Sequence, residues 1–247
     1  MIRGIYAAAA GMVAESQRND VTANNLANVN TAGFKKDVAV SRDFASVLIQ
    51  RINDGQAAAN VGTVGSGSQI DEVATIHTSG TVRYTGNDFD LAIDGKGYFV
   101  VETAEGLRYT RNGSFTRNGQ GELVTSDGLR VMGQTGPVAI GDGKMTVASD
   151  GTISIDGLET NQLRVVDFAD EKQLTKQGAS LFAAPEGVQA QQAAGTVNQG
   201  YLEMSNVNVV AEMVNMINGF RAYEINGKSV QAHDHLLDKA VNEVGRV

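Results

Sequence analysis

The stretch ANNLANVNTAGFKK (residues 23–36) closes a run of residues with helical character, and it is unusually rich in asparagine. Asparagine is a poor residue for a helix interior, because its amide competes for nearby backbone groups. Four asparagines lie within seven positions: Asn24, Asn25, Asn28 and Asn30. A plain helix end with a loop would need one asparagine, so the sequence predicts a specialised joint here. Gly33 permits the turn, because glycine tolerates positive φ.

A long helix is predicted at the other end of the chain. From Val209 onward, two rows of positions repeat every seven residues, which is the spacing of coiled-coil a and d positions. The rows are Met213, Phe220, Gly227, Asp234 and Val241, and Val209, Met216, Tyr223, Val230, Leu237 and Val244. A helix over 209–244 would be about 54 Å long at 1.5 Å per residue. A surface helix folded on its own domain is the alternative, and the number of repeats favours coiled-coil packing.

The N-terminal segment shows a weaker version of the same spacing. One row contains Ile5, Met12, Asn19 and Leu26, and the other contains the small residues Ala9, Ser16 and Ala23. Isolated helices gain little stability in water, since most of it comes from burying an apolar stripe. We therefore expect the two ends of the chain to bury each other, together with neighbouring copies.

Between the helical ends the sequence is typical of an all-β domain. From Phe89 onward, short apolar runs alternate with Asn-Gly and Asp-Gly pairs, beginning at Asp94-Gly95. Such pairs are strong hairpin signals, because glycine supplies positive φ. The predicted fold class is α+β: a discontinuous α-helical coiled-coil domain formed by the N- and C-terminal helices, with an inserted all-β domain.

The predicted domain boundaries follow these changes in pattern. Residues 1–36 form the N-terminal helix and turn, 37–88 an extended connector with a short helix, 89–200 the β-rich domain, and 201–247 the C-terminal coiled-coil helix. The short helix is suggested by Phe44, Val47, Leu48 and Arg51. Residues 53–69 are rich in Gly and Ala, which predicts a flexible or extended connector that becomes ordered on assembly.

Composition excludes several classes of partner. The net charge of −8 argues against nucleic acid, which needs clustered Lys and Arg, and it disfavours anionic membranes. No apolar run reaches the length of a transmembrane helix, so we expect no membrane insertion. The first residues superficially resemble a signal peptide, but Gly4, Gly11 and Glu15 interrupt the apolar segment. The sequence therefore predicts a retained amphipathic helix.

The residues that would carry enzymatic chemistry are absent or badly spaced. There are no cysteines, which excludes thiolate metal ligands and cysteine nucleophiles. His233 and His235 are two residues apart on a predicted helix, so their side chains point about 200° apart and cannot share a metal. The GKS of residues 227–229 lies inside that helix rather than opening one, so it is not a phosphate loop. We predict no enzyme activity, no metal, no cofactor and no small-molecule substrate.

Long motifs throughout the chain resemble the flagellar axial proteins, which are the rod, hook and hook-associated subunits. The NNLAN and GF of residues 24–34 are similar to the N-terminal signature of that family. Stretches resembling the rod members are DLAIDGKGYFVVE (90–102), YTRNGSFTRNGQGELVTSDG (109–128), GYLEMSNVNVVAEMVNMI (200–217) and RAYEINGKSVQAHD (221–234). The resemblance covers nearly the whole chain in order and is weakest over residues 53–82.

By this resemblance the chain is identified as a member of the flagellar basal-body rod protein family, of the FlgF/FlgG type. The short chain, its compact β middle and its ending NEVGRV favour the proximal, FlgF-like type. The resemblance implies a structural subunit of the rod, which is the drive shaft of the bacterial flagellum. The implied location is the basal body, where the rod crosses the periplasm or cell wall.

The same resemblance implies how the subunit works and with what. Copies polymerise helically through their terminal helices and transmit torque to the hook. The implied partners are other copies of the chain, other rod and hook proteins, and the flagellar type III export apparatus, through which the chain passes without signal-peptide cleavage. A secreted coiled-coil adhesin or binding module, with the β domain as its ligand head, is the alternative interpretation.

The residues expected to form the assembly interface come from the helical rows and from the joint. In the joint, asparagine amides can bridge to the backbones of adjacent subunits, and Phe34 can anchor the departing chain in a neighbouring apolar pocket. The expected interface residues are Ile5, Met12, Asn25, Leu26, Asn28, Gly33, Phe34, Asn206, Met213, Met216, Phe220, Tyr223, Val230 and Leu237.

Overall fold

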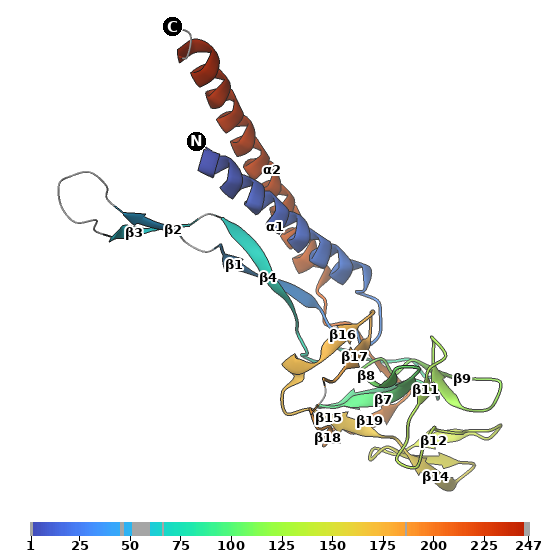
Figure 1. Ribbon diagram of the computed structural model, residues 1–247. Helices are drawn as coiled ribbons and strands as arrows, with labels where there is room; N and C mark the ends of the chain where they lie inside the picture. Colours follow the sequence, from blue (N-terminus) through green and yellow to red (C-terminus); the bar gives the residue numbers. More distant parts are fainter. Residues whose placement is uncertain (1, 45–46, 51–59, 66, 186, 245–247) are drawn as a thin grey trace. The chain divides into compact units, whose positions relative to one another are not determined.

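The computed structural model describes residues 2–44, 47–50, 60–65, 67–185 and 187–244 (Figure 1). The chain divides into two compact units. The helical unit comprises residues 1–26, 37–74 and 209–247, and the β unit comprises residues 27–36 and 75–208. Helices near both ends of the chain and a mainly β middle confirm the predicted α+β class.

Two long helices dominate the helical unit. They are α1 (Ile2–Ala27) and α2 (Val209–Lys239), and a wider π-helical turn over Ala240–Val244 continues α2. The alanine-rich start of α1 favours a helix, and α1 ends where the asparagine-rich stretch offers competing amides. Glu212 lies in the first turn of α2, where its negative charge interacts favourably with the positive end of the helix dipole. Within the described residues, neither helix is apolar over a length that would span a membrane.

The helical unit also contains two short β pairs. Strand β1 (Asp37–Asp43) pairs with β4 (Ser68–Thr75), and β2 (Val47–Gln50) pairs antiparallel with β3 (Asn60–Val64). The predicted short helix is therefore wrong over 47–50. The physical reason is that the β-branched residues Val47 and Ile49 favour the extended backbone, and β3 supplies a pairing partner. Arg51 and residues 53–59 of the predicted connector lie outside the described residues.

Antiparallel strands form the β unit. They are β5 (Val82–Tyr84), β6 (Leu91–Asp94), β7 (Tyr98–Thr103), β8 (Gly106–Thr110), β9 (Phe115–Arg117), β10 (Leu123–Thr125), β11 (Arg130–Val131), β12 (Met145–Val147), β13 (Thr152–Ile155), β14 (Leu158–Gln162), β15 (Val165–Asp167), β16 (Thr175–Gln177), β17 (Leu181–Ala183), β18 (Gln191–Gln192), β19 (Thr196–Gln199) and β20 (Tyr201–Glu203). A 3₁₀ turn spans Glu171–Gln173. The largest sheet has the order β16-β17-β8-β7-β11-β10-β9, and β15 joins β7 to β18. Smaller sheets pair β12-β13-β14, β19-β6 and β20-β5.

Strand β7 lies at the centre of the β unit and is covered on both faces. Phe99 and Val101 pack into one apolar cluster with Leu91 and other buried residues, while Tyr98 and Val100 pack into a second cluster. This division follows from the two-residue period of a strand, which sends successive side chains to opposite faces. The uninterrupted apolar run YFVV is therefore a strand buried on both sides.

The predicted hairpin chemistry is clear at the turn between β13 and β14. Asp156 and Gly157 both have positive φ, at 52° and 85°, which is the requirement of a type I′ turn. Ile155 and Leu158 pair directly across this turn. The local Asp-Gly signal thus specifies the connection without help from distant contacts.

Candidate functional site

Helices α1 and α2 run antiparallel and meet along a seam of glycines and polar side chains. Gly4 faces His233, Gly11 faces Asn226, and Asn19 faces Gly219. As the residue number rises on α1 it falls on α2, which establishes the antiparallel direction. A Cβ added to Gly11 would lie 2.8 Å from Asn226 Nδ2, so the Asn226 side chain would have to move to admit a larger residue. Figure 1 shows the two helices side by side.

The observed seam differs in phase from the predicted rows. On α2 its central row is Glu212, Gly219, Asn226 and His233, which keeps the seven-residue period. The predicted row of Met216, Val230 and Leu237 is half-buried and flanks this seam, whereas Met213, Phe220 and Tyr223 are exposed. On α1, Ile5, Met12 and Leu26 are half-buried. Apolar residues alone could not reveal this phase, because the seam row on α2 consists of Glu212, Gly219, Asn226 and His233.

A band of exposed residues lies on the opposite face of α2. Helical spacing places the band, which we call the outer stripe, about 180° from the seam. The outer stripe consists of Val210, Val214, Ile217, Arg221, Ile225 and Lys228. Its four aliphatic side chains are at least half exposed, and Ile217 is 52% exposed. Contiguous exposed apolar surface of this kind marks an interaction site. The outer stripe is therefore the candidate assembly surface.

Asn25 joins the end of α1 to the start of β1. Its Nδ2 donates to the Asp37 carbonyl oxygen at 2.7 Å, and its Oδ1 accepts from the Asp37 backbone N–H at 2.9 Å. The side chain is buried, so both ends of the amide are used inside the helical unit. The sequence predicted that this amide bridges to adjacent subunits. In the structure it instead bonds to the backbone of its own chain.

We expect the Asn25→Ala substitution to loosen β1. It removes the two hydrogen bonds that the amide makes to the Asp37 backbone, and each such bond contributes roughly 0.5–1.5 kcal/mol. Amide hydrogen exchange over 37–43 should accelerate, while the β unit keeps its protection. Asn30→Ala, at an exposed asparagine of the same stretch, is the matched control. Unchanged exchange in 37–43 would contradict the assignment.

The double replacement of Asn25 and Asn28 by alanine should impair rod formation more than it destabilises the β unit.

The rest of the opening stretch belongs to the β unit. Asn28 accepts a hydrogen bond from the Thr31 hydroxyl, which stabilises the turn after α1. Gly33 has φ +67°, and a Cβ there would collide with the backbone of Arg111 and Asn112, so only glycine fits. Phe34 is 1% exposed, and the Lys176 ammonium lies 3.8 Å from its ring centroid. The pocket that holds Phe34 is in its own chain.

A buried ion network follows Phe34. Lys35 Nζ lies 2.5 Å from Glu203 Oε1 and donates to the Thr78 carbonyl oxygen at 2.9 Å. Arg111 Nη1 lies 3.3 Å from the other oxygen of Glu203. All three side chains are at most 2% exposed. Burial lowers the pKa of the Lys35 ammonium, and the adjacent Glu203 carboxylate opposes that shift.

Three segments distant in sequence meet at this network. Residues 33–36, 76–80 and 203–206 form what we call the three-segment junction. The Gly80 backbone N–H donates to Glu203 Oε1 at 2.9 Å, and the Gly33 N–H donates to the Glu203 carbonyl oxygen at 2.8 Å. Asn206 completes the junction, because its Oδ1 accepts from the Lys36 N–H and its Nδ2 donates to the Ile76 carbonyl oxygen, both at 2.8 Å. Glu203 is the centre of the junction.

Sequence reasoning missed Lys35, Arg111 and Glu203. The available signal was a charged residue inside each apolar pattern, such as Glu203 in GYLEM. That signal does not say which charges meet, since the three residues are separated by up to 168 positions. Asn206, from the same region, was predicted to be an assembly-interface residue. The structure places its side chain in the three-segment junction of its own chain.

Within the described residues, no group of three or more His, Asp and Glu side chains could hold a metal ion. His233 lies in the seam and His235 is exposed on α2. An exposed apolar stripe on a terminal helix, and a separate β unit held by a buried junction, are the features of a structural subunit.

Comparison with known proteins supplies the family. Three family models match in chain order: "Flagella basal body rod protein" over residues 5–35, "Flagellar hook protein FlgE/F/G D1 domain" over 92–155, and "Flagellar basal body rod FlgEFG protein C-terminal" over 198–243. The flagellar basal-body rod protein FlgG of Bacillus subtilis is 35% identical, covering 98% of this chain and 99% of the relative. FlgG of Agrobacterium fabrum is 37% identical, covering 95% and 97%. The flagellar hook-basal body complex protein FlhO of Bacillus subtilis is 28% identical, covering 100% of both chains.

The chain belongs to the flagellar basal-body rod protein family. It is accordingly a structural subunit of the rod in the bacterial flagellar basal body, with a role in cell motility. The family is one of structural proteins rather than enzymes. The rod assignment, rather than the adhesin alternative, is therefore the function that the comparisons support.

Proposed function

We propose that copies of this chain polymerise helically through their terminal helices, and that the polymer transmits torque to the hook. The observation that carries the proposal is the outer stripe, which presents aliphatic side chains on the face of α2 opposite α1. The seam occupies one face of α2 and leaves the other free for neighbouring subunits. Helices α1 and α2, from the two ends of the chain, form one discontinuous domain. In the polymer they pack as coiled coils with the helices of neighbouring copies.

The proposed interface divides the expected residues into two sets. Met213, Phe220 and Tyr223 are exposed on α2 and contact neighbouring subunits directly. Residues with partners inside the chain act by shaping the subunit: Ile5, Met12, Asn25, Leu26, Asn28, Gly33, Phe34, Asn206, Met216, Val230 and Leu237. Other rod and hook proteins, at the two ends of a stack of this subunit, are the further proposed partners.

We also propose export through the flagellar type III apparatus with the N-terminal segment retained. Gly4 and Gly11 both belong to the seam, so removal of a leader containing them would remove two of the three seam contacts named above. The proposed location is the part of the rod that crosses the periplasm or cell wall. A subunit with the N-terminal residues of α1 present in assembled basal bodies, detected by mass spectrometry, would support retention.

Electron microscopy of basal bodies from a deletion strain tests the function. We expect the rod to be absent or truncated and the cells to be non-motile. The point of truncation also tests the proximal, FlgF-like assignment, which remains a prediction, since the relatives named above are FlgG and FlhO. Complete rods and normal motility in the deletion strain would contradict the proposed function.

Isolated subunits should be protease-sensitive in the helical unit. The outer stripe has no cover in a monomer, and helices gain most of their stability from burying such stripes. Limited proteolysis of dilute protein should therefore cut within α1 and α2 and leave a protected fragment that contains 75–208. Circular dichroism that shows fully formed, heat-stable helices in a dilute monomer would contradict this expectation.

A further inference from the structure

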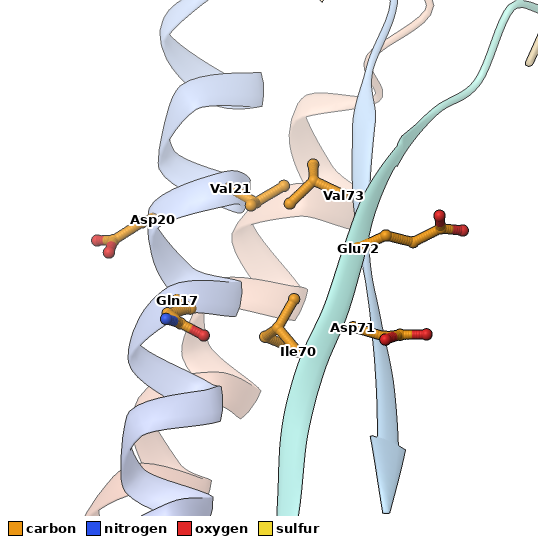
Figure 2. Close-up of a pocket in the computed structure, with 7 residues that line it drawn as sticks. All are labelled: Gln17, Asp20, Val21, Ile70, Asp71, Glu72 and Val73. Carbon is orange, nitrogen blue, oxygen red and sulfur yellow. The ribbon is translucent and has the colours of Figure 1, made fainter. Parts of the chain in front are cut away.

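A groove between α1 and β4 offers a surface complementary to the outer stripe. Its volume is about 460 Å³, and it is lined by Gln17, Asp20, Val21, Ile70, Asp71, Glu72 and Val73. Figure 2 shows Val21, Ile70 and Val73 pointing into the space between the helix and the strand. Asp20 and Glu72 point outward on the two sides. The groove thus has an apolar floor with acidic edges, and we call it the α1–β4 groove.

The acidic edges carry charge that the helical unit does not neutralise. Asp71 pairs with Arg42 at 3.0 Å. No described residue forms an ion pair with Asp20 or Glu72, which leaves one uncompensated carboxylate on each side of the groove. Such an edge favours a cationic partner and repels an acidic one.

The outer stripe has the matching composition. Its aliphatic residues Ile217 and Val214 stand one and two helical turns before Arg221, and Ile225 follows one turn after it on the same face. Lys228 pairs with Glu224 at 2.7 Å, whereas no described residue pairs with Arg221. Because the stripe lies opposite the seam, it points away from the α1 of its own chain. Its apolar and cationic side chains are therefore available to a second copy.

We propose that the outer stripe of one subunit docks into the α1–β4 groove of a second copy, with Arg221 between the acidic edges. This inference rests on the proposed polymerisation and names the surfaces that meet in it. Ile217 and Val214 cover the floor residues Val21 and Val73, and Arg221 approaches Asp20 or Glu72. Each copy has one stripe and one groove, so the contact is head-to-tail and extends into a polymer.

Disulfide cross-linking tests the contact directly, because the natural sequence has no cysteine. The chain carrying Ile217→Cys and Val73→Cys should give a ladder of cross-linked multimers in isolated basal bodies. The control carries Ile217→Cys and Val13→Cys, since Val13 is a similarly exposed valine on α1 outside the groove. Cross-linking of the control pair with none of the groove pair would overturn the proposal. A cross-link of the groove pair to a rod protein of different mass would overturn the choice of a second copy.

Charge reversal is an independent test that needs no new bond. Arg221→Glu should weaken self-association about tenfold or more, because like charges then meet across the groove. Adding Glu72→Arg to the same chain should restore assembly and motility, whereas adding Glu159→Arg, at an exposed site in the β unit, should not. Normal assembly of the Arg221→Glu variant would also contradict the proposed docking contact.

The proposed function and the proposed docking contact can fail separately. If a deletion strain builds complete rods, the proposed function is wrong. If deletion abolishes the rod but neither the groove cross-link nor the charge exchange behaves as expected, the subunit polymerises through another surface and only the docking inference fails.

Discussion

The Glu203→Gln substitution should lower the thermal midpoint of the β unit by roughly 10 °C. It keeps the shape of the side chain but leaves the buried cations Lys35 and Arg111 without a counter-ion. Breaking a buried ion pair by neutralising one partner costs about 3–5 kcal/mol, and each kcal/mol shifts the midpoint by about 2–4 °C in a domain of this size. Calorimetry or near-ultraviolet circular dichroism of the full chain measures the effect.

Two further variants make this prediction specific. Lys35→Met should destabilise the β unit less than Glu203→Gln, because it leaves one cation facing one carboxylate and removes an ammonium whose burial is unfavourable. Glu224→Gln removes a carboxylate from an exposed ion pair on α2 and should leave the β-unit transition unchanged. A midpoint for Glu203→Gln equal to that of Glu224→Gln would show that the junction does not hold the β unit together.

The Ile217→Glu substitution should abolish rod assembly without unfolding the subunit. Ile217 is exposed in the single chain, and surface substitutions usually change stability by less than about 0.5 kcal/mol. In an assembled interface the same carboxylate would be buried without a partner, and such central positions contribute about 2 kcal/mol or more. Each contact would then weaken roughly 30-fold. Swimming assays and electron microscopy of basal bodies should show non-motile cells with truncated rods.

The controls for Ile217 separate an interface effect from a folding effect. Ile217→Val keeps the aliphatic surface and should preserve motility. Gln231→Glu places the same charge elsewhere on α2, at an exposed residue outside the outer stripe, and should be tolerated. The Ile217→Glu protein should retain the melting curve of the unaltered β unit. Motile cells with complete rods would show that the outer stripe does not contribute to assembly.

Patterns that depend on near neighbours in the chain were predictable from the sequence. The Asp156-Gly157 hairpin follows from the backbone preferences of two residues, and the long helix over 209–239 follows from a spacing repeated within one segment. The strand YFVV was recognisable because its apolar run lies between turn residues. These features need no distant partner, so they could be predicted from local sequence, and the long motifs identified the family.

Which surfaces and which charges meet depends on contacts that form only in the folded chain. The phase of the α1–α2 seam depends on the close packing of the Asn19 side chain against Gly219. These two residues are 200 positions apart. Lys35 and Glu203 are 168 positions apart, so their buried ion pair depends on the folding of distant segments. The VLIQ segment became a strand because β3 was there to pair with it. Local preferences set the period and type of an element, whereas burial and partner depend on contacts between distant segments, and these decided the junction, the seam and the outer stripe.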